Sequence, residues 1–477
     1  MSGLPRFAVV GHPNKGKSSI VATLAQNDGI AIALEPGTTR DSDVYPLRVD
    51  GDTLYELIDT PGFQRPRQAL GWMREHSRSA SDRPDTVRAF VIQHRGDARF
   101  HDECELLQPI IDGAGILYVV DGSVPYSSEN EAEMDILRWT GRPSLALINH
   151  IGDHDCSASW EAALGQYFRI VRHFDAVRAP FEEHLGLLRG FGELASGWRE
   201  PLERAVHHLR EQRKRRDTQA VTLIAAALGD MLRHTETRTL REGADRGEAE
   251  STLRQRWRDW ERQREKQLRQ DIEKLYRHRR LERQERDLAW DADDDLFSER
   301  TRHAWGVSRA YLAAAGFGAG ALGGAGIDAL AVGHTLGAGT VIGGVLGAAG
   351  SIYYGGRLDR LKLGPLSSGG QQARFGPVRD PQFGYVVLGR ALEHAWCVAR
   401  RNHAGRDPLA LGDSGDRWLQ HLGKRQRMSL QKALLAPPRD AGDARRREAM
   451  EAAIDDAMTA FDAWRAGKDV PISRAPR

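Results

Sequence analysis

The nine residues 11–19, GHPNKGKSS, constrain the fold of this 477-residue chain more than any other part of its sequence. They fit the pattern G-x-x-x-x-G-K-[ST] of a phosphate-binding P-loop. Glycines in this pattern let the backbone wrap closely and turn its N–H groups inward on an anion. The lysine reaches the phosphates and the Ser/Thr hydroxyl ligates Mg²⁺. The residues expected to hold the phosphates are Gly11, Asn14, Lys15, Gly16, Lys17, Ser18 and Ser19.

The segments on either side of this motif fit a P-loop. Residues 7–10, FAVV, read as a short buried strand, and residues 18–24 read as the first turns of a helix. A helix N-terminus is itself an anion site, because its first N–H groups lack partners within the helix. The alternative is a glycine-rich turn before a helix that binds no phosphate.

Short apolar runs alternate with amphipathic stretches through the first 195 residues, which is typical of βαβ units. Several runs are rich in Val, Ile and Leu throughout, as parallel strands buried on both faces are. We expect an α/β P-loop domain over 1–195 with a mostly parallel sheet and helices on both faces. The long segment 63–113 reads as an insertion with helices of its own, such as 102–111. The expected strands are 7–10, 42–49, 53–59, 115–121 and 144–149.

The composition changes after residue 195, and the rest of the chain reads as largely α-helical. Residues 196–305 are dense in Arg, Glu and Gln, which indicates a solvated helical arm or a coiled-coil hairpin. Residues 359–477 form a predicted α-rich C-terminal domain. Within it, 358–382 reads as a turn-rich connector and 383–401 as a strand or buried run followed by a helix. A final amphipathic helix is expected near 443–464.

Residues 306–358 are the sharpest change in composition. The segment 310–356 is apolar and glycine-rich, with glycines at every fourth residue in two stretches, a spacing that lets helices approach closely. We expect a helical hairpin that contacts a membrane. Two alternatives are a Gly/Ala helix pair packed in a protein core and a hairpin that drives homo-oligomerisation. Asp328 argues against simple exposure to lipid.

The net charge, the cysteines and the N-terminal residues argue against several classes of protein. A net charge of +2 gives the whole chain no strong nucleic-acid signature. Cys104, Cys156 and Cys397 lie far apart, which argues against a disulfide framework or a zinc site and suits a reducing compartment. No secretory signal is visible. We expect a cytoplasmic protein that associates with the inner membrane through 310–356.

Two further motifs suggest a phosphate-sensing switch. DTPG at 59–62 directly follows an expected strand, so Asp59 would position Mg²⁺ and the Gly62 N–H would meet the γ-phosphate. Upstream, PGTTRDSD supplies Thr38 and Thr39, of which Thr39 is the better candidate to cap the metal. The predicted Mg²⁺ residues are therefore Ser18, Thr39 and Asp59.

With these motifs in place, residues 5–180 resemble the translation-factor-related GTPases, and by motif the Era-like proteins and the tRNA-modification GTPase. The resemblance implies GTP as substrate, Mg²⁺ as cofactor and a catalytic set of Lys17, Thr39, Asp59 and Gly62. The layout of the whole chain looks like a bacterial GTPase family whose C-terminal domain has no assigned function.

Asn14 and Phe63 refine the expected chemistry. Asn14 lies where potassium-dependent members of this class place an asparagine that helps to hold K⁺ against the phosphates; the alternative is a loop residue that tolerates left-handed backbone. Phe63 follows DTPG where Ras-type proteins carry a glutamine that orients water. We expect slow intrinsic hydrolysis, stimulated by K⁺, a partner or a residue from elsewhere.

The base-reading motif departs from the family pattern N-K-x-D. In LINHIGDHD, Asn149 fits the asparagine, but His150 replaces lysine and Gly152 occupies the aspartate position. Asp153 or Asp155 would read guanine if the loop is longer, and otherwise ATP remains an alternative. Ala176 lies about where a backbone N–H contacts the base in this class.

These observations predict a GTPase that acts as a switch on a membrane-associated helical half, with GTP and GDP as its ligands. The alternative is an Era-like factor directed to RNA, ribosomes or tRNA modification, in which the Arg-rich helices would bind nucleic acid.

Overall fold

The computed structural model divides the chain into two compact units. One comprises Met1–Arg216 with Tyr276–Arg283 and Ala399–Pro408, and the other comprises Asp217–Leu275, Gln284–Val398 and Leu409–Arg477. We call them unit 1 and unit 2 and describe each by itself. The residues that the structure describes are 4–27, 42–152, 154–241, 244–278, 362–365, 371–378, 381–405, 416–440 and 442–466.

Unit 1 is built on a six-stranded sheet with the order β2-β3-β1-β4-β5-β6. Every pair of neighbours is parallel except β2 and β3, which are antiparallel. The five expected strands are present, and β6 adds a sixth that its short, polar sequence did not indicate. The strands are β1 (Arg6–Val10), β2 (Asp43–Val49), β3 (Asp52–Asp59), β4 (Gly115–Asp121), β5 (Ser144–Asn149) and β6 (Ile170–His173).

Helices cover both faces of this sheet, as the apolar strands predicted. Side chains of β1 alternate between two cores: Phe7 and Val9 pack with α1, α7 and the start of α8, whereas Ala8 and Val10 pack with the helices of the other face. This alternation follows from the period of two in a strand. The helices are α1 (Lys17–Leu24), α4 (His101–Ile111), α5 (Ser128–Trp139), α6 (Ser157–Leu164), α7 (Phe181–Leu194) and α8 (Ser196–Arg233).

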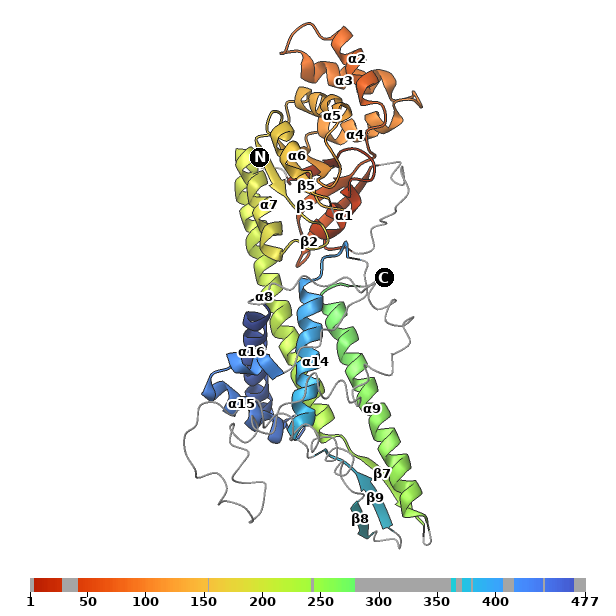
Figure 1. Ribbon diagram of the computed structural model, residues 1–477, viewed down its shortest axis with the longest axis vertical. Helices are drawn as coiled ribbons and strands as arrows, with labels where there is room; N and C mark the ends of the chain where they lie inside the picture. The colour runs from red at the N-terminus through yellow and green to blue at the C-terminus, as the bar shows by residue number, and fades with distance from the viewer. Residues whose placement is uncertain are drawn as a thin grey trace. The chain divides into compact units, whose positions relative to one another are not determined.

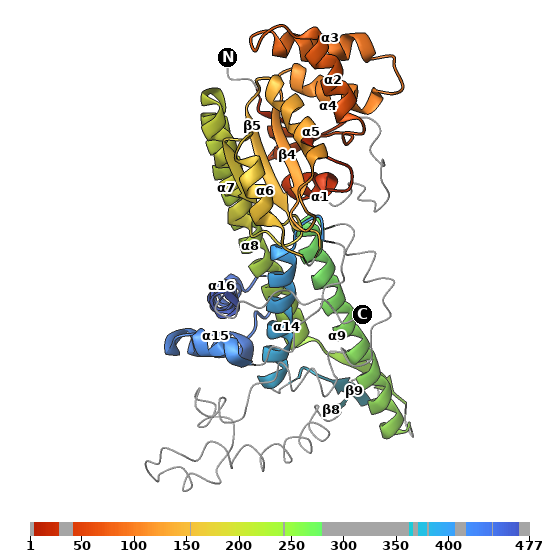
Figure 2. The same cartoon turned by 45° about the horizontal axis from the view of Figure 1, so that its top comes forward.

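The expected insertion after DTPG is helical. It contains α2 (Pro66–His76) and α3 (Arg83–His94) and ends in α4, which coincides with the predicted helix 102–111. Figures 1 and 2 show α2 and α3 stacked on α4 and α5, on the side away from the sheet. Their buried side chains join the core that also holds Ala8 and Val10, so the insertion extends one face of unit 1.

Unit 2 is mainly helical but also contains a three-stranded antiparallel sheet with the order β7-β9-β8, against which α9 packs. The helical character agrees with the sequence; the sheet was not foreseen, and two of its strands lie in the expected connector 358–382. Its elements are the end of α8, β7 (Glu236–Leu240), α9 (Arg246–Leu275), β8 (Lys362–Pro365), β9 (Gln371–Phe375), α14 (Pro381–Arg400), η4 (Asp416–His421), α15 (Lys424–Leu435) and α16 (Ala444–Ala466).

Two expectations for unit 2 need correction. Residues 383–401 do not begin with a strand, because α14 runs unbroken and its apolar residues are buried all along the helix. The helix α9 is not a solvated arm on every face: Trp257 and Ile272 are buried, and so are the acids Glu261 and Glu265. Arg390 of α14 compensates the burial of Glu265, because its Nε donates to Glu265 Oε1 at 2.6 Å.

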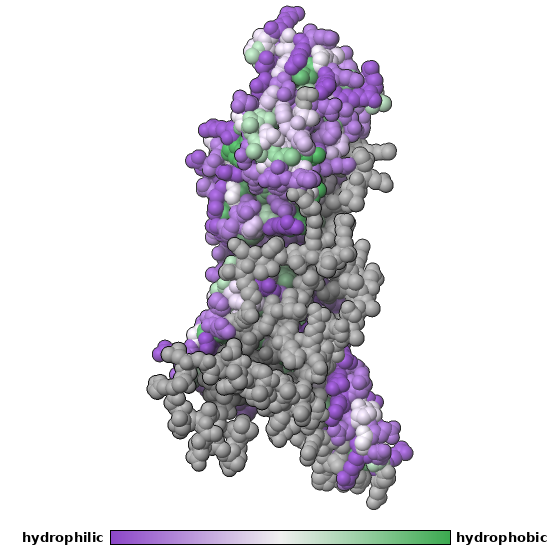
Figure 3. Space-filling model, viewed as in Figure 1, coloured by the Kyte–Doolittle hydropathy of each residue, from purple (hydrophilic) through white to green (hydrophobic). Residues whose placement is uncertain are grey.

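The predicted membrane hairpin 310–356 lies outside the described residues, and so does the whole region 306–358 that contains it. Among the residues that the structure describes, no helix combines the length and the apolar character that a membrane crossing requires. The described surface in Figure 3 is predominantly hydrophilic, with small, scattered apolar groups. The three cysteines are free.

Candidate functional site: a phosphate cradle between β1 and α1

The loop between β1 and α1 has the backbone of a tight cradle. Gly11 and Gly16 have φ of 143° and 80°, and Asn14 adopts left-handed backbone with φ of 61°. A Cβ on Gly11 would lie 2.4 Å from Val119 O, and one on Gly16 would lie 2.3 Å from Asn149 Nδ2. Both positions therefore require glycine. No side chain caps the N-terminus of α1, so its first N–H groups remain available to an anion.

Lys17 lies folded into this loop. The residue is 8% exposed, and Nζ donates to Gly11 O at 3.3 Å and to His12 O at 3.2 Å. Burial lowers the pKa of Lys17, while the charges of Asp59 and Glu133 oppose that shift. Among the described residues, the hydrogen-bond acceptors of this ammonium are two carbonyl oxygens, which compensate its charge poorly, so a phosphate group would improve its surroundings.

Ser18 and Asp59 meet beside Lys17. Ser18 Oγ donates to Asp59 Oδ2 at 2.7 Å, and the side chain of Asp59, at the end of β3, is buried. The other oxygen, Asp59 Oδ1, is buried and has no hydrogen-bond partner among the described residues. Burial raises the pKa of Asp59, against the effects of the Ser18 hydrogen bond and the Lys17 charge. One hydroxyl and one carboxylate with a spare buried oxygen fit Mg²⁺, which prefers oxygen ligands. Thr38 and Thr39 lie outside the described residues.

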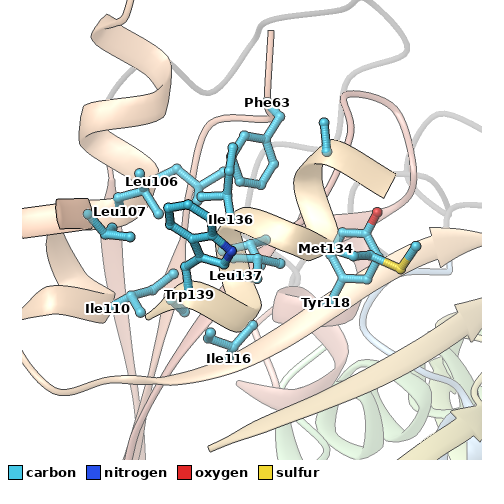
Figure 4. Close-up of a cluster of buried hydrophobic side chains, with 14 of the residues drawn as sticks. Phe63, Leu106, Leu107, Ile110, Ile116, Tyr118, Met134, Ile136, Leu137 and Trp139 are labelled. Carbon is cyan, nitrogen blue, oxygen red and sulfur yellow. The ribbon is translucent and has the colours of Figure 1, made fainter. Parts of the chain in front are cut away.

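The DTPG loop is fixed against the P-loop. Thr60 Oγ1 donates to Val9 O at 2.8 Å, and a Cβ on Gly62 would lie 2.6 Å from Pro13 N. Gly62 therefore passes directly beside the cradle. The ring of Phe63 is fully buried in the hydrophobic core that also holds Leu106 and Leu107 (Figure 4). A side chain held in the core cannot orient water at a phosphate.

Asn149, at the end of β5, joins the P-loop to the loop after β6. Its Nδ2 donates to Lys15 O at 3.3 Å, and its Oδ1 accepts from Ala176 N at 3.2 Å. Thr23 of α1 holds the same segment from the other side, donating to Ala176 O at 2.7 Å. The structure thus brings together Asn149 and Ala176, as a base-binding site requires.

Asp155, one of the two candidates for reading guanine, lies two residues before α6. Its Oδ1 accepts from the N–H of Ser157, the first residue of α6, at 3.0 Å, while Asp153 lies outside the described residues. His150, in place of lysine, has its Nε2 3.0 Å from Ser157 Oγ. Lys15 Nζ lies 4.0 Å from Asp121 Oδ2, and Ser19 lies in the first turn of α1.

Two buried glutamates near the cradle were missed from the sequence. Glu133 of α5 contacts His12 Nδ1 at 2.9 Å through Oε1 and accepts from Tyr118 OH at 2.8 Å through Oε2, so it braces the P-loop. Glu103 of α4 accepts from the backbone N–H groups of Gln64 and Arg65 at 2.8 and 2.5 Å. Both lie in ordinary amphipathic helices, and a charged residue on an otherwise apolar helix face was the one signal present.

The P-loop, the Ser18–Asp59 pair and the order of motifs on a mostly parallel sheet define unit 1 as a P-loop GTPase domain. Residues 6–150 match the family model of the 50S ribosome-binding GTPase, and residues 161–459 match the domain of unknown function DUF3482. Because the second match covers more than half of the chain, the protein belongs to the DUF3482 family.

Curated bacterial proteins resemble the N-terminal part of the chain. GTPase Der of Mycoplasma pneumoniae is 50% identical over 144 residues, which is 30% of this chain and 26% of the relative. GTPase Der of a Marinomonas species is 34% identical over 131 residues, 28% of this chain and 22% of the relative. The chain thus spans about a quarter of the length of these curated relatives.

Solved structures of Era also match. Era in complex with MgGDPNP and a segment of 16S ribosomal RNA is 18% identical, covering 36% of this chain and 51% of that chain, with a TM-score of 0.25. An Era variant of Aquifex aeolicus bound to GDP and AlF₄⁻ is 15% identical, covering 57% of this chain and 89% of that chain, with a TM-score of 0.26.

Proposed function

We propose that this protein binds GTP with Mg²⁺, hydrolyses it slowly, and uses the state of the nucleotide to control its helical half. The observation that carries the proposal is the group formed by Lys17, Ser18 and Asp59, in which a buried ammonium and a buried carboxylate oxygen both lack full compensation. A Mg²⁺–triphosphate supplies the missing partners of both at once.

Each residue of the cradle has a distinct task in this proposal. The N–H groups of the P-loop and Lys17 bind the β- and γ-phosphates, while Ser18 and Asp59 hold the metal, with Thr39 as a further ligand. When bound, Mg²⁺ neutralises phosphate charge. Gly62, beside Pro13, offers its N–H to the γ-phosphate and begins the loop that senses it.

Slow turnover follows from Phe63, whose ring is buried and leaves the attacking water without a side chain at this position. We propose that K⁺ at Asn14, or a partner, supplies the missing stimulation. Asn14 is exposed in the P-loop, so its side chain is accessible to an ion beside the phosphates. Its left-handed backbone equally suits an asparagine retained only for the turn.

Binding and turnover of GTP and ATP, each with KCl and with NaCl, test these assignments together. We expect GTP to bind more tightly than ATP, and KCl to raise the rate. Lys17→Ala should weaken nucleotide binding about 10- to 100-fold, because a charge-assisted contact to phosphate is lost. Lys274→Ala, at an exposed lysine of α9, is the matched control. An unchanged affinity in the Lys17 variant would refute the site.

Two binding partners are considered for the helical half that the nucleotide controls. We propose a membrane, reached through the apolar segment 310–356. The description of the family matched by residues 6–150 supports the alternative of a ribosome-directed GTPase. Flotation with lipid vesicles that survives a high-salt wash favours the first. Co-sedimentation with ribosomes that is lost as salt rises favours the second.

A further inference from the structure

The helix α4 contacts the two loops that would sense the nucleotide. Directly before β2, and two residues after Arg40 of the first predicted switch, Ser42 Oγ donates to Glu105 O at 3.0 Å. At the start of the second loop, Glu103 Oε1 accepts from Gln64 N and Arg65 N. Two residues of a single helix, Glu103 and Glu105, therefore contact the start of the second loop and the residue directly before β2.

Burying the Glu103 carboxylate lowers the stability of the fold, so stability alone does not explain this contact. Its side chain is fully buried, and Oε2 has no hydrogen-bond partner among the described residues. A buried carboxylate with one unmet oxygen is worse for stability than an apolar residue of similar size. The contribution of a glutamate at this position is its acceptor Oε1, which fixes the direction of two successive backbone N–H groups.

The position of those N–H groups in the chain matters for the reaction. Gln64 lies two residues after Gly62, so its N–H is within about 7 Å of the Gly62 N–H along the backbone. Phe63 between them is anchored in the core. The direction of the Gly62 N–H toward a γ-phosphate thus depends on how the segment 63–65 is held.

We propose that Glu103 is a positioning residue for GTP hydrolysis: it holds the loop after Gly62 through Gln64 and Arg65 and, with the Ser42–Glu105 contact, couples that loop to the start of β2. This proposal rests on the proposed GTPase function. Glu103 does not touch the nucleotide, and it acts only through the backbone that carries Gly62.

The test combines kinetics with hydrogen exchange on the full-length chain. We expect Glu103→Ala to lower kcat about tenfold with KM for GTP changed less than about threefold, since small displacements of a catalytic loop cost up to about a hundredfold. Exchange at the amides of Gln64 and Arg65 should rise at least about tenfold, because their acceptor is gone. Glu103→Gln keeps an acceptor oxygen and should recover most of kcat.

Glu75→Gln is the matched control, since it removes an exposed carboxylate of the neighbouring helix α2 that takes no part in these contacts. We expect its kcat and exchange to equal those of the wild type. Ser42→Ala tests the coupling: combined with Glu103→Ala, it should lower kcat by less than the product of the two separate losses.

The outcomes distinguish the positioning role of Glu103 from a structural role, from the coupling to Ser42 and from the proposed GTPase function. If Glu103→Ala reduces only the melting temperature, with kcat and the exchange of Gln64 and Arg65 unchanged, Glu103 is a structural residue and the positioning role is refuted. If the two losses multiply, the coupling is refuted. If the wild-type protein hydrolyses no GTP under any salt condition, the proposed function fails instead, and the positioning role fails with it.

Discussion

A buried acid in α9 gives a quantitative prediction on stability. Glu261 is fully buried, and neither carboxylate oxygen has a hydrogen-bond partner among the described residues. The nearby Arg264 is already engaged, since it donates to Asp230 Oδ2 through Nε at 3.1 Å and Nη2 at 3.0 Å. Burial raises the pKa of Glu261 to about 9, with Arg264 opposing the shift. We expect Glu261→Met to stabilise unit 2 at neutral pH.

The size of the effect follows from the two pKa values. In the unfolded chain Glu261 ionises near 4.5, whereas the folded state keeps it protonated up to about 9. Between these values the unfolded state binds fewer protons, so the wild-type protein loses stability as pH rises, by about 1.4 kcal/mol per pH unit. At pH 7 the loss is about 3 kcal/mol. It disappears below pH 4.5, where both states are protonated.

Chemical denaturation at pH 5, 6, 7 and 8, monitored by hydrogen exchange in peptides of α9, measures the free energy of unfolding of the wild type and of Glu261→Met. The advantage of Glu261→Met over the wild type should grow with pH. Glu248→Gln, at an exposed glutamate of the same helix, should stay within about 0.5 kcal/mol of the wild type. A difference that stays constant from pH 5 to pH 8 would show that Glu261 does not titrate between folded and unfolded states, and the reasoning from burial would be wrong.

Two substitutions test the cradle. Gly16→Ala should weaken nucleotide binding at least about tenfold, because it strains left-handed backbone and places Cβ 2.3 Å from Asn149 Nδ2; Gly71→Ala, where a Cβ meets open space in α2, should bind normally, and equal affinities in fluorescence titrations would contradict the cradle geometry. Asn149→Ala leaves Ala176 N and Lys15 O without their partner, at about 1–3 kcal/mol, so GTP should bind about 5- to 150-fold more weakly. A dissociation constant within twofold of the wild type would remove Asn149 from the site.

Local sequence patterns predicted the core of unit 1 well. The expected strands β1, β4 and β5 are runs of apolar residues that the parallel sheet buries on both faces, so the run itself carries the information. The P-loop is equally local: φ of 143° at Gly11 and 80° at Gly16 explains why glycine occurs there, and the helix begins at the next residue, Lys17.

The sequence by itself determined an α/β domain with a phosphate cradle between its first strand and helix, because these features depend on residues close together in the chain. Only the tertiary structure placed Glu103 under the switch loop, 39 residues from Gln64, and paired Glu265 with Arg390, 125 residues away. The same holds for α14, whose apolar run fits a buried strand or a buried helix equally well until its neighbours are known. Burial of a charge is decided by which partner the fold brings to it, and no local pattern records that partner.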